Sequence, residues 1–128
     1  MTDVPDGHRI LVVEDDEDVL RMVYRLLSDL GNVAMARDGQ AALDLMQRGG
    51  PPDLVVSDVL MPHLDGLEMT RQMRADPQLA KVPVIFLTAR TGTKDLIEGI
   101  NAGARHYLTK PFTPEALLGK VRKALGID

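Results

Sequence analysis

Carboxylate, hydroxyl and amine side chains stand at the ends of four short apolar runs in this sequence. Carboxylates that meet at one place repel each other and raise each other's proton affinity, and a hard divalent cation with oxygen ligands relieves that repulsion. Acidic ligands around Mg²⁺, joined by one lysine and one hydroxyl, suit phosphoryl transfer, because the cation and the ammonium neutralise charge on the phosphoryl oxygens. Asp58 is the expected attacking group. The residues are Glu14, Asp15, Asp58, Thr88 and Lys110.

The apolar runs that end in these residues predict buried strands, because each is short, continuous and rich in aliphatic side chains. The four expected strands of this kind are Ile10–Val13, Leu54–Ser57, Pro83–Thr88 and His106–Thr109, and the weaker run Val33–Ala36 is expected as a fifth strand.

Helical patterns separate the runs. Apolar residues at helical spacing, with glycine or proline near the ends, predict five helices. They are Val19–Leu30 capped by Gly31, Ala41–Met46 closing at Gly49-Gly50, Leu64–Met73, a helix around Leu96, Ile97 and Ile100 capped by Gly103, and Pro114–Leu125.

Five alternating strand and helix units favour an α/β fold with one doubly wound parallel sheet and helices on both faces. In an open parallel sheet, ligands bind beyond the carboxyl ends of the strands. Residues far apart in the sequence would therefore converge on one edge.

Composition limits the class of protein. The chain has 128 residues, a net charge of −4 and no cysteine, which fits one globular domain and excludes disulfides, thiolate zinc sites and cysteine nucleophiles. The acidic balance argues against direct nucleic-acid binding. Neither a signal peptide nor an apolar stretch of membrane-spanning length is visible. We expect a cytoplasmic protein without membrane contact.

Each candidate residue also has an ordinary interpretation. Asp16, Glu17 and Asp18 suit the first turn of a helix, where acids favour the helix dipole. Asp58 alone could be a turn acid, and Lys110 alone a solvated lysine. The joint placement of the candidates at four strand ends is what favours a site. The three histidines, His8, His63 and His106, share no metal-ligand spacing and are expected on the surface or in loops.

Four segments resemble the receiver domains of two-component response regulators, including the stand-alone chemotaxis type. The resemblance covers about residues 9–125. Its motifs are Ile10-Leu11-Val12-Val13-Glu14-Asp15-Asp16, Ser57-Asp58-Val59-Leu60-Met61-Pro62 with Asp65-Gly66, Thr88-Ala89, and Gly103-Ala104 through Tyr107 to Lys110-Pro111-Phe112.

The resemblance implies a flavodoxin-like fold with strand order 2-1-3-4-5 and a phosphoacceptor at Asp58. It also implies a Mg²⁺ site, which could take Mn²⁺ instead. Asp15 is implied as the direct carboxylate ligand, Glu14 as its partner acid and the Leu60 carbonyl as a further protein ligand, with Asp58 completing the set.

The resemblance further implies a switch. Thr88 would move to bind the phosphoryl group, Lys110 would pair with it, and Tyr107 would turn inward as Thr88 moves. Pro111 would follow a cis peptide bond. Arg90 and Leu60 are implied as modulators of how fast water reaches the phosphoryl group.

The implied partners are a sensor histidine kinase or phosphotransfer protein, and a downstream target or output domain. The chain would catalyse only its own phosphorylation and dephosphorylation, so it is not expected to be an enzyme. Residues 1–8 are expected to be a flexible N-terminal segment, 9–125 the receiver domain and 126–128 the C-terminal end. The sequence fits both a stand-alone regulator and a receiver taken from a longer protein.

One departure concerns assembly. Receivers of winged-helix transcription factors commonly carry two acids just before the switch aromatic, used in a symmetric dimer, and here those positions are Arg105 and His106. A monomer and a phosphorylation-dependent dimer both stay open.

Two rival functions compete with the switch. A phosphatase of the aspartyl-nucleophile class needs a second acid two residues after its nucleophile, and that position is Leu60. An interaction module that has lost its chemistry would lack an acid, the lysine or the hydroxyl, and all of these are present.

Overall fold

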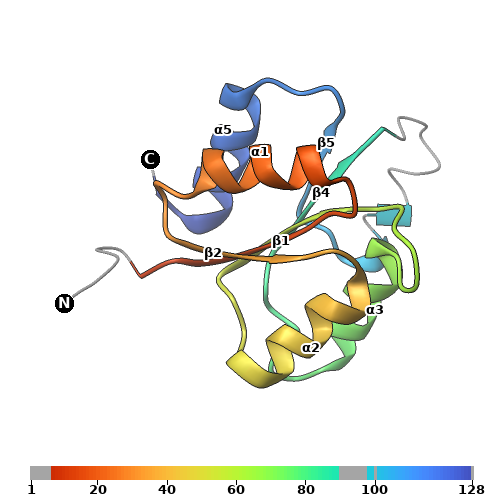
Figure 1. Ribbon diagram of the computed structural model, residues 1–128. Coiled ribbons are helices and arrows are strands. Elements are labelled where there is room, and N and C mark those ends of the chain that lie inside the picture. Colours follow the sequence, from red (N-terminus) through yellow and green to blue (C-terminus); the bar gives the residue numbers. More distant parts are fainter. Residues whose placement is uncertain (1–6, 90–97, 100, 128) are drawn as a thin grey trace.

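The computed structural model describes residues 7–89, 98–99 and 101–127. At its centre lies a parallel sheet of five strands in the order β2-β1-β3-β4-β5 (Figure 1). This confirms the doubly wound α/β fold and the strand order 2-1-3-4-5. The strands are β1 (Arg9–Val13), β2 (Asn32–Ala36), β3 (Leu54–Asp58), β4 (Val84–Thr88) and β5 (His106–Thr109).

Helices cover both faces of the sheet. In the described ranges they are α1 (Glu17–Leu27), α2 (Gly39–Gly49), α3 (Gly66–Ala75) and α5 (Pro114–Leu125). Helices α1 and α5 lie on one face, and α2 and α3 lie on the other (Figure 1). The predicted helix around Leu96, Ile97 and Ile100 falls on residues outside the described ranges.

The two faces of the sheet build two separate cores because strand side chains alternate in direction. In β1, Ile10 and Val12 pack with Leu20 and Leu117 from α1 and α5. The intervening residues of β1 belong to the core that α2 and α3 complete. Phe86 of β4 is fully buried in that second core. The near-continuous apolar runs seen in the sequence follow from this two-sided burial.

Side chains cap the helix starts, which satisfies backbone N–H groups that have no partner within the helix. Asp16 caps α1, Asp38 caps α2, Asp65 caps α3 and Thr113 caps α5, each by accepting a hydrogen bond from a backbone N–H in the first turn. Asp16 is therefore a cap and not a first-turn residue. Asp65 also delays the start of α3 to Gly66, two residues after the predicted start.

The predicted end of the first helix is wrong. Helix α1 ends at Leu27 with Ser28 as its C-cap, and the Ser28 hydroxyl donates a hydrogen bond to the Tyr24 carbonyl at 2.6 Å. Gly31 instead lies where the chain turns into β2 beside His8. A methyl group on Gly31 would overlap the His8 carbonyl oxygen, so glycine is needed there for a close backbone approach.

In the parts of the chain that the structure describes, no helix combines the length and the hydropathy that crossing a bilayer requires.

Candidate functional site

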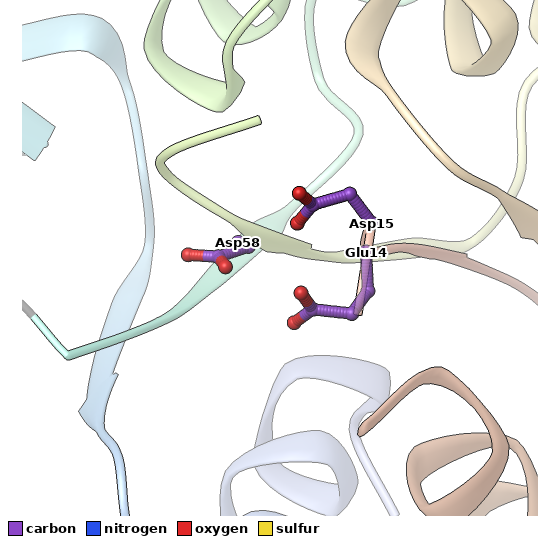
Figure 2. A group of neighbouring side chains, drawn as sticks. All are labelled: Glu14, Asp15 and Asp58. Carbon is purple, nitrogen blue, oxygen red and sulfur yellow. The ribbon is translucent and has the colours of Figure 1, made fainter. Parts of the chain in front are cut away.

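Three carboxylates converge at the carboxyl edge of the sheet, where β1 and β3 end side by side. Glu14 and Asp15 follow β1, and Asp58 is the last residue of β3. Each offers one oxygen, and these oxygens all lie within 4.8 Å of one another. Figure 2 shows the carboxylates of Asp15 and Glu14 on opposite sides of the end of β1, with Asp58 beside them. Because β1 and β3 are neighbours in the sheet, residues more than forty positions apart in the sequence come together here.

Lys110 lies against two of these carboxylates. Its Nζ donates to Oε1 of Glu14 at 2.9 Å and to Oδ2 of Asp58 at 3.2 Å. The lysine follows β5, and its backbone N–H donates to the Thr88 carbonyl at 2.8 Å, which fixes the start of its side chain beside the end of β4. The amine thus reaches across the site from the far edge strand. The peptide bond between Lys110 and Pro111 is cis.

Backbone groups hold the acidic side chains in place. Oδ1 of Asp58 accepts a hydrogen bond from the Val59 N–H at 2.6 Å, and Oε2 of Glu14 accepts one from the Asp16 N–H at 3.2 Å. Glu14 is buried, with 2% of its surface exposed, and Asp58 keeps 9%. Asp15 is exposed. The site is therefore a buried pair of carboxylates with a third at its mouth.

Burial shifts the pKa of Glu14, one member of this pair. It raises the pKa of Glu14 to about 7, and the nearby Asp58 carboxylate adds to the rise, against the opposing hydrogen bond from Lys110. For Lys110, burial favours the neutral amine, but the hydrogen bonds and charges of Glu14 and Asp58 outweigh it and raise the pKa. One ammonium does not fully compensate two buried carboxylates, and this deficit of positive charge suits an added cation.

The end of β4 brings a hydroxyl to the same edge. Thr88 is buried and is the last residue of its strand. Thr88 lies opposite Thr109, and Phe86 lies opposite Tyr107, in the register of β4 with β5. Residues two apart on a strand share a face. Thr88 and Tyr107 therefore lie on the face of the sheet that α2 and α3 cover.

Tyr107 is half-buried and packs against the core on that face. Its ring lies close to Gly99, where an added methyl group would come within 3.4 Å of Cδ2 of both Tyr107 and Phe86. The rings of Tyr107 and Phe86 therefore both lie next to Gly99.

The loop after β3 carries the remaining described candidates. Leu60 is 55% exposed, so its side chain projects from the rim of the site. His63 is exposed and has a φ of 68°, the left-handed region. Arg90, the other predicted modulator, lies outside the described residues.

Sequence reasoning missed two features of the site. It predicted that Lys110 pairs with an incoming phosphoryl group and did not predict its ion pair with Glu14, 96 residues earlier. It also named Gly66 only as part of a motif, although a methyl group there would overlap the Asp58 carbonyl oxygen and lie 3.1 Å from Cε1 of Phe86. The Asp-Gly pair at 65–66 was the available signal for this close approach.

Comparisons with known proteins agree with this geometry. Residues 10–122 match the sequence model of the family described as the response regulator receiver domain. Response regulator MprA of Mycolicibacterium vanbaalenii is 47% identical over 118 residues, which cover 91% of this chain and 50% of that protein. The chain spans about half the length of the curated relatives that it matches first.

Solved structures give the same result. The chemotaxis response regulator CheY4 of Vibrio cholerae has a TM-score of 0.86 and 35% identity, covering 93% of this chain and 99% of that one. The receiver domain of the sensor histidine kinase PA1611 from Pseudomonas aeruginosa has a TM-score of 0.85 and 32% identity, with coverage of 94% and 98%. That structure is described as having a magnesium ion coordinated in its active-site cleft.

Proposed function

This chain belongs to the family of response regulator receiver domains, and on that premise we propose that it is a signalling switch that accepts a phosphoryl group on the Asp58 carboxylate. The observation that carries the proposal is the arrangement at the carboxyl edge of the sheet. Asp58 shares its surroundings with two further carboxylates, and the Lys110 amine lies 3.2 Å from its Oδ2.

The donor set fits a hard divalent cation. Oxygen ligands close to one another, partly buried and short of positive charge, are what Mg²⁺ prefers. We propose Glu14, Asp15, Asp58 and the Leu60 carbonyl as the protein ligands, for Mg²⁺ or for Mn²⁺ in its place. The PA1611 receiver, described with a magnesium ion in its cleft, supports this assignment. The cation would supply positive charge to the oxygens of the incoming phosphoryl group.

The reaction is a transfer between side chains. An oxygen of Asp58 attacks the phosphorus of a phosphohistidine on a sensor kinase or phosphotransfer protein. The new bond joins that oxygen to phosphorus, the phosphorus–nitrogen bond breaks, and the departing imidazole keeps the electron pair. Lys110 is already beside Asp58 and would hold an oxygen of the transferred group. Water can later hydrolyse the acyl phosphate, so the chain changes only its own state and is no enzyme for other substrates.

The switch is a population shift between two states. In our proposal Thr88 turns toward the phosphoryl oxygens, and Tyr107 moves inward on the same face of the sheet. The readout surface would comprise β5, α5 and residues 93–102. Most of residues 93–102 lie outside the described ranges. Arg90 and Leu60 would adjust the access of water to Asp58.

The partners follow from the family. We propose a cytoplasmic protein that receives its phosphoryl group from a histidine kinase or phosphotransfer protein and acts on a target or an output domain, without direct contact with nucleic acid. Because the curated relatives are about twice as long as this chain, such an output domain is part of the proposal. Arg105 and His106 would prevent a dimer that depends on acids at these positions.

Intact-mass measurement tests the proposal. The protein is incubated with a small phosphodonor, with and without Mg²⁺, beside Asp58→Asn and the matched variant Asp29→Asn. Asp29 is an exposed residue after α1. We expect one phosphoryl adduct that needs Mg²⁺, breaks down in alkali, persists in Asp29→Asn and is missing from Asp58→Asn.

Two outcomes would contradict the proposal. An adduct that survives in Asp58→Asn would place the phosphoacceptor elsewhere. A folded protein that gains no adduct from the small donor, and none from any histidine kinase offered to it, would favour an interaction module without phosphoryl chemistry.

A further inference from the structure

A hollow lies at the edge of the sheet opposite to the Asp58 site, and its chemistry differs from that of the site. Its volume is about 450 Å³, and it is lined by the end of α3, the turn before β4 and the segment before β5. All strands are parallel, so the segments that precede β4 and β5 lie at the amino edge. Strands of five residues separate the two edges by roughly 15 Å. The hollow is therefore separate from Asp58 and does not depend on the proposed function.

The lining of the hollow is strongly cationic. Arg74, Lys81 and Arg105 contribute to it, and among the described residues that line it there is no aspartate or glutamate. None of the three forms an ion pair with a carboxylate in the described part of the chain. Lys81 and Arg105 are exposed. In a chain of net charge −4, three adjacent cations without an acid are a local reversal of the overall charge.

Arg74 is held rigidly in this hollow. Its Nη1 donates to the carbonyls of Leu79 at 3.3 Å and Ala80 at 3.2 Å, and its Nη2 donates to the Gly103 carbonyl at 2.8 Å. A methyl group on Gly103 would lie 2.6 Å from Nε of Arg74, and Gly103 has a φ of +104°. Both facts require glycine there. The turn before β5 is thus shaped around the guanidinium.

These carbonyl bonds account for Arg74 as a structural link between α3 and the two turns. They do not account for Lys81 and Arg105, and the charge of Arg105 adds to the cost of a half-buried guanidinium. Burial lowers the pKa of Arg74, and the charge of Arg105 lowers it further. The guanidinium of Arg74 has five N–H donors, and the three hydrogen bonds to backbone carbonyls leave two of them for another acceptor.

We propose that this hollow is a binding site for the phosphate group of a small molecule, held by Arg74, Lys81 and Arg105. A phosphate carries more than one negative charge and several acceptor oxygens, and therefore suits three cations better than a single carboxylate does. The fixed guanidinium would provide directed hydrogen bonds, and the two exposed side chains would close on the anion as mobile charges.

Residue-resolved NMR titration tests the site. The probe is inorganic pyrophosphate, added to the whole chain in Mg²⁺-free buffer at constant ionic strength, with a nucleoside diphosphate as the second ligand. We expect saturable shifts of the amides of Ala80, Val82, Gly103 and Ala104. Equal affinity for both probes would show that the phosphate groups alone are recognised, and tighter binding of the nucleotide would show an organic phosphate as the ligand class.

Paired variants separate a site from general attraction. Lys81→Ala with Arg105→Ala removes two charges at the rim and leaves Arg74 in place. Arg25→Ala with Arg48→Ala removes the same charge from exposed positions on α1 and α2. We expect the first pair to weaken binding about tenfold or more, since charge-assisted hydrogen bonds are lost, and the second pair to leave it unchanged. Shifts that do not saturate, shifts confined to the surroundings of Asp58, or equal weakening in both pairs would overturn the proposal.

Discussion

The buried carboxylate of Glu14 makes the stability of the metal-free protein depend on pH in an unusual direction. Its pKa is about 7 in the folded chain, against an ordinary value of 4.5. Between these two values the folded state keeps a proton that the unfolded chain has released. Folding is then coupled to proton uptake, so the free energy of unfolding falls as the pH rises from 4.5 to 7.

The variant Glu14→Gln removes this titration and keeps the size of the side chain. One pH unit of pKa difference corresponds to about 1.36 kcal/mol, and the difference between about 7 and 4.5 therefore gives at most about 3 kcal/mol. Because Glu14 is only 2% exposed, solvent screens little of this effect. We expect the wild type to lose about 2 to 3 kcal/mol relative to the variant between pH 5 and pH 8.

Urea denaturation at both pH values, in the presence of a chelator, measures the effect. Other titrating groups, including His106, occur in both proteins and cancel in the comparison. With saturating Mg²⁺ the wild type should gain stability toward pH 8, because a cation binds the ionised carboxylates more tightly, and Glu14→Gln should gain less. Parallel pH dependences of wild type and variant, within about 0.5 kcal/mol, would refute the argument that Glu14 is costly when ionised.

Two further predictions concern packing and local structure. Gly66→Ala should destabilise the fold by about 1–3 kcal/mol and slow adduct formation, because the added methyl group meets the Asp58 carbonyl and the Phe86 ring. Its control is Gly119→Ala in α5, where nothing lies within 4 Å of the added methyl group. This control should raise the free energy of unfolding by about 0.5–1 kcal/mol through helix propensity. Urea denaturation measures both variants, and equal effects would rule out the close approach at Gly66. Thr113→Ala should cost about 1 kcal/mol, because its Oγ1 accepts the Ala116 N–H at 3.1 Å. Thr113→Ser keeps that oxygen and should retain most of the stability, whereas a loss equal to that of alanine would show that capping is not the cause.

The sequence contained enough to predict β1, β3 and β4 because these strands are buried on both faces and read as continuous apolar runs. The edge strands β2 and β5 were also predicted, although both contain exposed residues. Helix ends were harder to place. Gly31 suited a C-cap by its residue type, but its actual requirement is the passage of the chain beside the His8 carbonyl, a contact that no local pattern encodes.

The site shows the same division. Strand ends of a parallel sheet share one edge, and this rule alone brought Glu14, Asp15, Asp58, Thr88 and Lys110 to one place. The pairing of Lys110 with Glu14 depends instead on the length and direction of two side chains from β5 and β1. The cationic hollow around Arg74 likewise had no signal in the sequence, because its three charges come from separate turns with no shared motif.

The position of Lys110 on the sheet gives the two parts of the site different resistance to local opening. The carboxylates stand at the ends of β1 and β3, each of which has a paired strand on both sides. Lys110 follows β5, an edge strand that, among the residues the structure describes, pairs with β4 alone. Local unfolding that detaches β5 and α5 from the rest of the sheet would separate the Lys110 amine from the carboxylates and leave the carboxylates together. Hydrogen exchange at the amides of β5 would therefore be faster than at those of β1 and β3. The negative charges of the site therefore lie at the ends of internal strands, which open least readily, and the amine that neutralises them follows an edge strand.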